Sequence, residues 1–270
     1  KKRLKSYMSQ GRSYAKARQI ALDDVRQDLS HLLNSPNNIL AIEYLKQIIL
    51  NKYPIQPIAV KRIGAGHDSV TANNATASAS MIRHMIGVKD KDYAGYIPSY
   101  VYKLLKDNAI NDIENYKDII YQNLLTSNAD KLSSLPDISE DLANKIINNF
   151  NEYIDIRDFI EFISDKHHAK ARISRSLCHL LIGFDIPYSV LKSAPVPYIR
   201  ILAFNDNGRK YLNSIKDNIG LVSNTYDFYS NAKGFEKEIF RFDLIASNIY
   251  QLGIGGDKGK DFTSQVIYLR

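Results

Sequence analysis

The chain has 270 residues and a mass of 30.7 kDa, so it can bury the core of one large domain or two modest ones. Hydrophobic residues make up 44% and charged residues 24%, which excludes a disordered tail, and no apolar run approaches the ~20 residues that cross a bilayer. The single cysteine, Cys178, excludes a disulfide scaffold and a cysteine-based zinc site, and predicts a cytoplasmic protein. A net charge of +7 favours an anionic partner without identifying it.

Helical periodicity dominates the chain, and the first helices that it predicts span about residues 13–25, 35–49 and 78–87. The second of these has a clear start, because Ser35 can cap it and Pro36 suits its first turn. The apolar run Ile58–Val60 predicts one buried strand, and the polar stretch 64–76 predicts a functional loop. Helix, strand, loop and helix in this order are typical of an α/β nucleotide-binding unit, although a single strand cannot form a sheet.

The character of the chain changes within residues 89–95, a charged stretch that ends in Gly95. The helical segments predicted beyond it are 97–107, 114–126, 138–150, 156–164, 169–184, 207–217 and 235–251. Periodicity does not decide between strand and helix for 197–204. The predicted fold class is therefore an incomplete, Rossmann-like α/β portion followed by a mainly α-helical domain, in a chain that is predominantly α.

Several common catalytic patterns are absent from the sequence. The six histidines form no His-Glu-x-x-His or other metal-ligand spacing, so no metal site is predicted. There is no G-x-S-x-G elbow, no Walker A loop and no G-x-G-x-x-G motif. Hydrolase, P-loop and ordinary dehydrogenase functions therefore have no support.

Two polar groups in the first 90 residues suit a nucleotide. Asn37 and Asn38 stand in a first helical turn, beside unpaired backbone N–H groups, where an amide can bind a ribose or a base edge. Arg62 follows the predicted strand, at the end where open α/β sheets place ligands, and a guanidinium can bind two phosphate oxygens. The alternative is that the asparagines only start the helix and that Arg62 is an ordinary surface residue.

The helix that begins near residue 80 offers an anion pocket at its start. Ser78 or Ser80 can cap it, its first N–H groups point outward, and Arg83 lies on the same end one turn later. Hydroxyls, amides and a cation together suit a phosphate. An ordinary serine cap followed by a solvated arginine is the simpler alternative.

These segments resemble a known family. The sequence ASASMIR at 77–83 resembles the I-S-S-T-x-I-R phosphate motif of the HIGH-type nucleotidyltransferase superfamily. The wider sequence is similar to the tRNA(Met) cytidine acetate ligase family. The matching segments are SPNNILAIEYLK at 35–46, KR at 61–62, GAGHD at 64–68, KHHAKARISR at 166–175, and YIRILAFN at 198–205 with Gly208.

The resemblance implies a two-step reaction. Acetate and ATP would form acetyl-adenylate, with Mg²⁺ as the expected metal, and the acetyl group would pass to N4 of the wobble cytidine of elongator tRNA(Met) to give N4-acetylcytidine. It implies ATP contacts at Asn37 and Arg62, with Ser80 and Arg83 near phosphates by analogy with the superfamily motif. Residues 1–88 would be the later part of the ATP-binding domain, and 89–270 a helical tRNA-binding domain. The alternatives are a HIGH-type nucleotidyltransferase for a small molecule, and a non-catalytic RNA-binding module.

One family feature is missing. Family members begin with an N-x-F-H-N-G-H segment whose histidines stabilise the triphosphate, and these 270 residues contain no such segment. The catalytic histidines therefore cannot be assigned. We expect the chain to be a piece of a longer protein with little or no activity by itself.

The segment 166–184 suits RNA. On a helix from His168 to Phe184, apolar side chains share one side, whereas a narrow stripe on the other side could follow phosphates. The stripe consists of His168, Arg172, Arg175 and His179, flanked by Lys166 and Lys170. We expect the stripe to be free for a tRNA ligand. The alternative is a solvated charged face.

Overall fold

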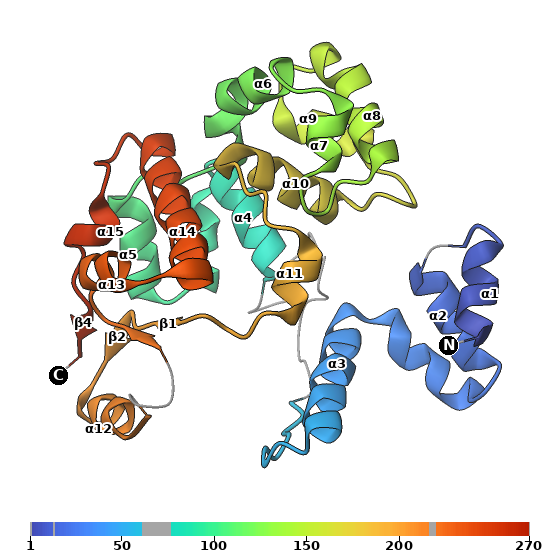
Figure 1. The fold of residues 1–270 in the computed structure, drawn as a ribbon, viewed down its shortest axis with the longest axis horizontal. Coiled ribbons are helices and arrows are strands. Elements are labelled where there is room, and N and C mark those ends of the chain that lie inside the picture. The colour runs from blue at the N-terminus through green and yellow to red at the C-terminus, as the bar shows by residue number, and fades with distance from the viewer. Residues whose placement is uncertain (1, 13, 61–76, 216–219, 270) are drawn as a thin grey trace. The chain divides into compact units, whose positions relative to one another are not determined.

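The structure is a computed structural model that describes residues 2–12, 14–60, 77–215 and 220–269 (Figure 1). Across these ranges the chain is predominantly α-helical, as predicted, with a few very short strands. It divides into two compact units, Lys1–Asp107 and Asn108–Arg270. None of the helices in the described ranges is both long and apolar enough to span a membrane. The functional division at residue 88 stays a prediction.

The first unit is built from helices and 3-10 turns. Its elements are α1 (Lys2–Ser9), α2 (Tyr14–Asp23), η1 (Gln27–Asn34), α3 (Pro36–Asn51), α4 (Ala79–Gly87), η2 (Lys91–Tyr96) and α5 (Ser99–Asp107). Helix α1 packs against α2, η1 contacts both α2 and α3, and α4 packs against η2. Arg18 of α2 donates to Glu43 of α3, with 2.9 Å between Nη2 and Oε1, and this ion pair joins the first half of the unit.

Helix α3 starts where the sequence predicts and extends to Asn51, beyond the predicted end at residue 49. Ser35 is the N-cap residue with an extended backbone, but its side chain makes no capping hydrogen bond, so the predicted serine cap is not formed. Pro36 occupies the first turn, where its missing N–H costs no intrahelical bond. The helix ends at Asn51, because Lys52 takes a left-handed conformation with φ of 52° and donates its N–H to carbonyls of the last turn.

The strand predicted at Ile58–Val60 is wrong. These residues have no assigned secondary structure, and Ile58 and Val60 are 84% and 88% exposed. A strand needs a neighbour to pair its N–H and C=O groups, and none of the described residues supplies one. The apolar character of the run is therefore not sufficient for a strand here.

The second unit follows the predicted helical segments closely. Its elements are η3 (Ile113–Tyr116), α6 (Lys117–Leu125), α7 (Ala129–Ser133), α8 (Glu140–Asn149), η4 (Phe150–Glu152), α9 (Ile156–Ile163), α10 (Lys170–Ile182), α11 (Tyr188–Ser193), β1 (Ile199–Arg200), β2 (Ala203–Phe204), α12 (Asp206–Ile215), β3 (Leu221–Val222), α13 (Thr225–Asn231), α14 (Gly234–Gly253), α15 (Lys260–Thr263) and β4 (Ile267–Tyr268). Every helical segment predicted beyond residue 96 contains a helix. The short helices α7, α11, α13 and α15 were not predicted.

The main core of this unit joins α6, α7, α8, α9 and α10. Helix α9 shows why, since Ile156, Phe159, Ile160 and Ile163 recur every three or four residues and are all buried. Buried side chains from the other helices complete the core: Ile120, Leu124, Leu132, Leu142, Ile146, Ile173 and Leu177. The core thereby fixes one face of α10 and leaves its opposite face toward the surface.

The start of α9 is held by a distant carboxylate. The N-cap residue Asp155 makes no side-chain capping bond. Instead, Oε2 of Glu114 accepts the Ile156 N–H at 3.0 Å, and its Oε1 accepts the Arg157 N–H at 2.8 Å. Glu114 therefore satisfies two N–H groups at the helix start and joins η3 to α9.

Two pairs of parallel strands follow the helical core. Ile199 of β1 lies opposite Leu221 of β3, and Ala203 of β2 lies opposite Ile267 of β4. The segment 197–204, for which strand and helix remained open, thus supplies a strand to each pair. Both pairings bring together segments that are far apart in sequence.

A polar network anchors β1 to helices α14 and α15. Arg200 donates from both Nη atoms to Asp261, at 3.2 and 2.9 Å, and its guanidinium lies 5.6 Å from the centre of the Phe240 ring. Tyr198 Oη donates to Asp243 at 2.7 Å. Burial and this hydrogen bond raise the pKa of Tyr198. Tyr198 and Arg200, which belong to the segment 198–205 that resembles the family, therefore hold β1 against α14 and α15.

The end of α14 is tied back to the start of the unit. Asn111 Nδ2 donates to the Tyr250 carbonyl at 3.2 Å, and Asn115 Nδ2 donates to the Gly253 carbonyl at 2.8 Å. A side chain at Gly253 would collide with the buried Tyr116 ring. Glycine at this position therefore permits the close approach of α14 to η3.

Candidate functional site

The ATP-binding candidates lie on two helices of the first unit. Asn37 is in the first turn of α3, whereas Ser80 and Arg83 are on α4, and all three side chains are exposed. Within the described ranges, no hydrogen bond or ion pair occupies these three side chains. Arg62 and the GAGHD segment lie outside the described residues. The ATP role of all four residues stays a prediction.

The structure decides which serine caps α4. Ser78 Oγ accepts the Met81 N–H at 3.0 Å, and Ser78 is only 2% exposed. Ser80 lies inside the helix with its side chain exposed. Ser78 therefore has the structural role, and the hydroxyl of Ser80 is accessible to a ligand.

The two arginines of α10, Arg172 and Arg175, both donate a hydrogen bond to Asp137. Arg172 Nε donates to the Asp137 carbonyl at 2.7 Å, and Arg175 Nε donates to Asp137 Oδ2 at 2.9 Å. Asp137 has a left-handed backbone, with φ of 68°. In the part of the chain that the structure describes, both arginines use only Nε, so their Nη atoms are available for phosphate oxygens.

The histidines of the predicted stripe differ from the arginines. Helix α10 begins at Lys170, so His168 lies in the preceding turn, where it is only 4% exposed. The expectation that His168 is free for a ligand is therefore wrong. His179 is partly buried, its Nδ1 lies 3.1 Å from the Pro136 carbonyl oxygen, and its ring lies 5.3 Å from that of Phe184. His179 is thus occupied by the protein itself.

The turn before α10 is organised by Asp165. Its Oδ1 accepts the N–H groups of His167 and His168 at 2.7 and 2.8 Å. Its Oδ2 accepts from Lys145 Nζ on α8 at 2.8 Å. The Lys145 hydrogen bond is the main cause that holds the pKa of the Asp165 carboxyl well below its usual range, and the turn amides add to it.

The same turn buries His168 between carboxylates. His168 Nδ1 lies 3.3 Å from Asp165 Oδ1, and its Nε2 lies 3.6 Å from Asp141 Oδ2. By contrast, Lys166 and Lys170 are exposed, and Lys170 forms an ion pair with Glu161. The exposed cations at this end of the unit are Lys166, Lys170, Arg172 and Arg175, which we call the cationic surface, although Arg172 is only half-exposed.

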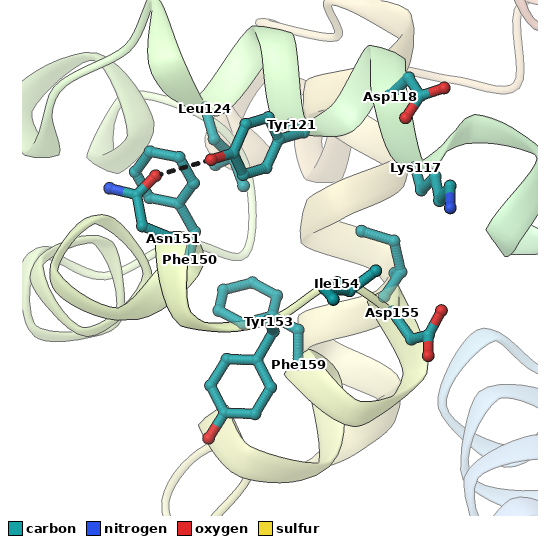
Figure 2. Close-up of a pocket in the computed structure, with 11 residues that line it drawn as sticks. Lys117, Asp118, Tyr121, Leu124, Phe150, Asn151, Tyr153, Ile154, Asp155 and Phe159 are labelled. Carbon is teal, nitrogen blue, oxygen red and sulfur yellow. Dashed lines mark hydrogen bonds between the residues drawn. The ribbon is translucent and has the colours of Figure 1, made fainter.

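A pocket of about 230 Å³ opens beside α6 and α9 (Figure 2). Aromatic rings line it, and Tyr121 Oη donates to Asn151 Oδ1 at 3.0 Å. The charged residues on its lining are Lys117, Asp118 and Asp155. Two carboxylates against one ammonium disfavour a phosphate. On the cationic surface, Lys170 and Arg175 are paired with the carboxylates of Glu161 and Asp137. Lys166 and the Nη atoms of the two arginines have no partner among the described residues.

Sequence reasoning missed the acidic residues that organise this surface. The sequence pattern does not point to Asp137 and Asp165, because acids near a basic helix do not suggest an RNA contact. A signal was present in each case. Pro136 before Asp137 is a common turn dipeptide, and an aspartate shortly before a helix often accepts backbone N–H groups.

Comparisons with known proteins agree with the resemblance. The sequence matches the family model of HIGH Nucleotidyl Transferase over residues 1–264. A tRNA(Met) cytidine acetate ligase from Clostridium perfringens is 34% identical over 261 residues, which cover 93% of this chain and 64% of that protein. A tRNA(Met) cytidine acetate ligase from Thermoanaerobacter is 33% identical, covering 100% of this chain and 69% of that protein. The chain thus spans about two thirds of these relatives.

Solved structures show the same fold. The apo crystal structure of Thermotoga maritima TmcAL matches with a TM-score of 0.87 at 20% identity, over 100% of this chain and 70% of that chain. The structure of the same protein with bound alpha-thio ATP matches with a TM-score of 0.83 at 21% identity, over 100% and 69% respectively. By sequence and by fold, the chain belongs to the tRNA(Met) cytidine acetate ligase family within the HIGH nucleotidyl transferases.

Proposed function

We propose that this chain acts in the ATP-dependent acetylation of N4 of the wobble cytidine of elongator tRNA(Met). The observation that carries the proposal is the match along the whole chain to relatives named tRNA(Met) cytidine acetate ligase. The alpha-thio ATP bound to the Thermotoga protein of the same fold supports ATP as a substrate. Acetate is the second substrate, and the tRNA is the acceptor.

The proposed chemistry has two steps. An acetate oxygen attacks the α-phosphorus of ATP, and pyrophosphate leaves with the electron pair of the broken P–O bond. The N4 amine of cytidine then attacks the acetyl carbon, AMP leaves, and N4 loses one proton. The first step needs mainly positioning and charge stabilisation, which polar and cationic side chains provide.

The first unit would bind ATP in this proposal. Asn37 can bind a ribose or base edge at the start of α3, and Arg62 can bind phosphate oxygens. Ser80 and Arg83 would contribute a hydroxyl and a guanidinium to the phosphates from α4. In the described ranges, no group of three or more His, Cys, Asp or Glu side chains could hold a metal ion. An Mg²⁺ ion that accompanies ATP would not need such a group, because phosphate oxygens, waters and one or two carboxylates commonly hold it.

The second unit would bind the tRNA backbone through the cationic surface. The Nη atoms of Arg172 and Arg175 face no protein partner among the described residues, and each guanidinium can bind a phosphate through two donors. Lys166 would add one point charge, and Lys170, which is paired with Glu161, would add less. His168 and His179 support the surface from within and would not contact the ligand directly.

The activity is tested with the complete product of the gene. Unmodified elongator tRNA(Met), ATP and isotopically labelled acetate should yield labelled N4-acetylcytidine, which mass spectrometry of the digested tRNA detects. Omission of ATP should abolish the product. A product that forms without ATP, or none with every substrate present, would contradict the proposal.

The tRNA surface is tested by replacing Arg172 and Arg175 with glutamine. The double variant removes two cations, so the slope of log K against log salt for tRNA(Met) should become shallower by about 1.5 to 2. Backbone contacts carry little sequence information, so the preference for tRNA(Met) over other tRNAs should change less than the affinity. Lys103→Gln with Lys106→Gln, which removes two cations from α5, is the matched control. Equal slopes for both double variants would contradict the assignment.

A further inference from the structure

The cationic surface begins on the turn that precedes α10. Helix α10 has Ala169 at its N-cap and therefore no side-chain cap of its own. Lys166 lies in the middle of the preceding turn, exposed and without a hydrogen bond or ion pair in the described part of the chain. The position of its backbone thus depends on the residues around it.

Asp165 closes this turn from inside. Its own N–H donates to the His168 carbonyl at 3.0 Å, while its Oδ1 accepts the N–H groups of His167 and His168 at 2.7 and 2.8 Å. These bonds enclose Lys166 between two fixed ends. The backbone of Lys166, and with it the point at which its side chain leaves the loop, is thereby fixed.

The closed turn is also fastened to α8. Lys145 Nζ donates to Asp165 Oδ2 and to the Ile163 carbonyl, both at 2.8 Å. His168 fills the remaining space, with its buried ring between Asp165 and Asp141. Two separate elements, α8 and the end of α9, therefore determine where the turn lies.

We infer that Asp165 is a positioning residue for the tRNA contact of the cationic surface, and that it acts by fixing Lys166 and the first turn of α10. The inference rests on the proposed function, because it assigns the phosphate backbone as the ligand. A positioning role and simple charge repulsion predict opposite effects of Asp165 on the affinity for tRNA. An acidic residue on a surface that binds a polyanion should weaken binding by repulsion, whereas a positioning residue strengthens it.

The change in tRNA affinity when Asp165 is replaced distinguishes the two roles. Asp165→Asn removes one negative charge and leaves only a neutral, weaker acceptor for the turn amides, and its amide group cannot form the ion pair with Lys145. Binding of tRNA(Met) is measured over a range of KCl concentrations. We expect the Asp165→Asn variant to bind more weakly than the wild type despite its higher net charge, with a salt slope shallower by about 1. Glu140→Gln, which removes an exposed charge at the start of α8, should bind as tightly as the wild type or more tightly.

Two further measurements separate positioning from lost stability. Partial unfolding would lower the fraction of protein that binds, whereas the salt slope of the folded molecules would not change. Hydrogen exchange at the His167 and His168 amides should accelerate in Asp165→Asn and stay unchanged in Glu140→Gln. Lys145→Met, which detaches the turn from α8 but keeps its inner hydrogen bonds, provides a second variant and should also reduce the slope.

The outcomes are distinguishable. Salt-dependent wild-type binding together with tighter binding or an unchanged slope in Asp165→Asn would overturn the inference alone. An absence of tRNA binding by the wild type would overturn the proposed tRNA role as well as the inference. Weaker binding, a shallower slope and faster amide exchange in the same variant would support it.

Discussion

Single carboxylates fix the backbone next to the two helices that matter most in the second unit. Glu114 satisfies the start of α9, and Asp165 closes the turn before α10. Asp137 orients Arg172 and Arg175 through its carbonyl and its side chain. Each is an acid whose oxygen atoms accept hydrogen bonds from named donors, so each should show a measurable effect on removal.

Loss of the Glu114 carboxylate should destabilise the second unit. Glu114→Ala leaves two N–H groups at the start of α9 without their acceptor, and we expect a loss of about 1–2 kcal/mol in the free energy of unfolding. Urea denaturation followed by circular dichroism measures it. Glu238→Ala, which removes an exposed carboxylate from the surface of α14, should cost much less. Equal losses would show that Glu114 does not cap α9.

Asp165 should make stability depend on acid. Its pKa is lowered in the folded state from an ordinary value of 3.8, chiefly by Lys145, so the unfolded chain takes up a proton first as the pH falls. The Asp165 carboxylate makes its full contribution to the free energy of unfolding above pH 3.8, the ordinary pKa of the group. This contribution decreases once the pH drops below that value. Urea midpoints recorded from pH 6 to pH 3 should therefore fall less steeply for Asp165→Asn than for the wild type. Parallel curves would contradict the lowered pKa.

At the scale of elements, amphipathic helices were predictable and isolated strands were not. Helix α9 follows from the spacing of its apolar residues, and the start of α3 follows from Pro36 in its first turn. The strand predicted at Ile58–Val60 is wrong because a strand depends on a pairing partner, which the local sequence does not contain. The prediction that His168 is free for a ligand is wrong for a similar reason, because tertiary contacts with Asp165 and Asp141 bury this side chain. The spacing of apolar residues thus predicts which helix a candidate residue lies on. It does not predict the residues from other parts of the chain that contact it.

The end of α10 gives a test of backbone conformation alone. Gly183 follows the helix with φ of 64°, and a Cβ there would meet no atom within 4 Å. Gly183→Ala should therefore cost about 1 kcal/mol of unfolding free energy through the left-handed backbone and not through a clash. Gly183→Asn should cost less, because asparagine tolerates this conformation better. A thermal or urea denaturation series would measure both, and an alanine variant as stable as the wild type would contradict this origin.

At the scale of the molecule, the described residues of the two units contribute very different numbers of buried apolar side chains. Among the described residues, the buried apolar side chains of the first unit are Ala17 and Met85, while the second unit contains the whole helical core. Large apolar side chains of α3, such as Tyr44 and Ile49, are exposed. Apolar burial is the main stabilising term in folding, so the units should differ in independent stability.

Expression of the units as separate chains tests this difference. Residues 108–270 should unfold in one cooperative transition, with dispersed amide signals in NMR spectra. Residues 1–107 should unfold gradually, because their described residues bury few apolar side chains. The same denaturation experiment on the full chain provides the reference. A cooperative transition for 1–107 alone would contradict the expectation.

The parallel pairing of β2 with β4 has a consequence for the order of events at the ribosome. Synthesis proceeds at about 5–20 residues per second, and helices α6 to α10 can assemble from contacts that are close in sequence. Strand β2 cannot complete its ladder until Ile267 and Tyr268 have left the exit tunnel. For seconds, the nascent chain therefore carries an open strand edge while the helical core has already folded. This interval is when the second unit is most exposed to aggregation and to proteases.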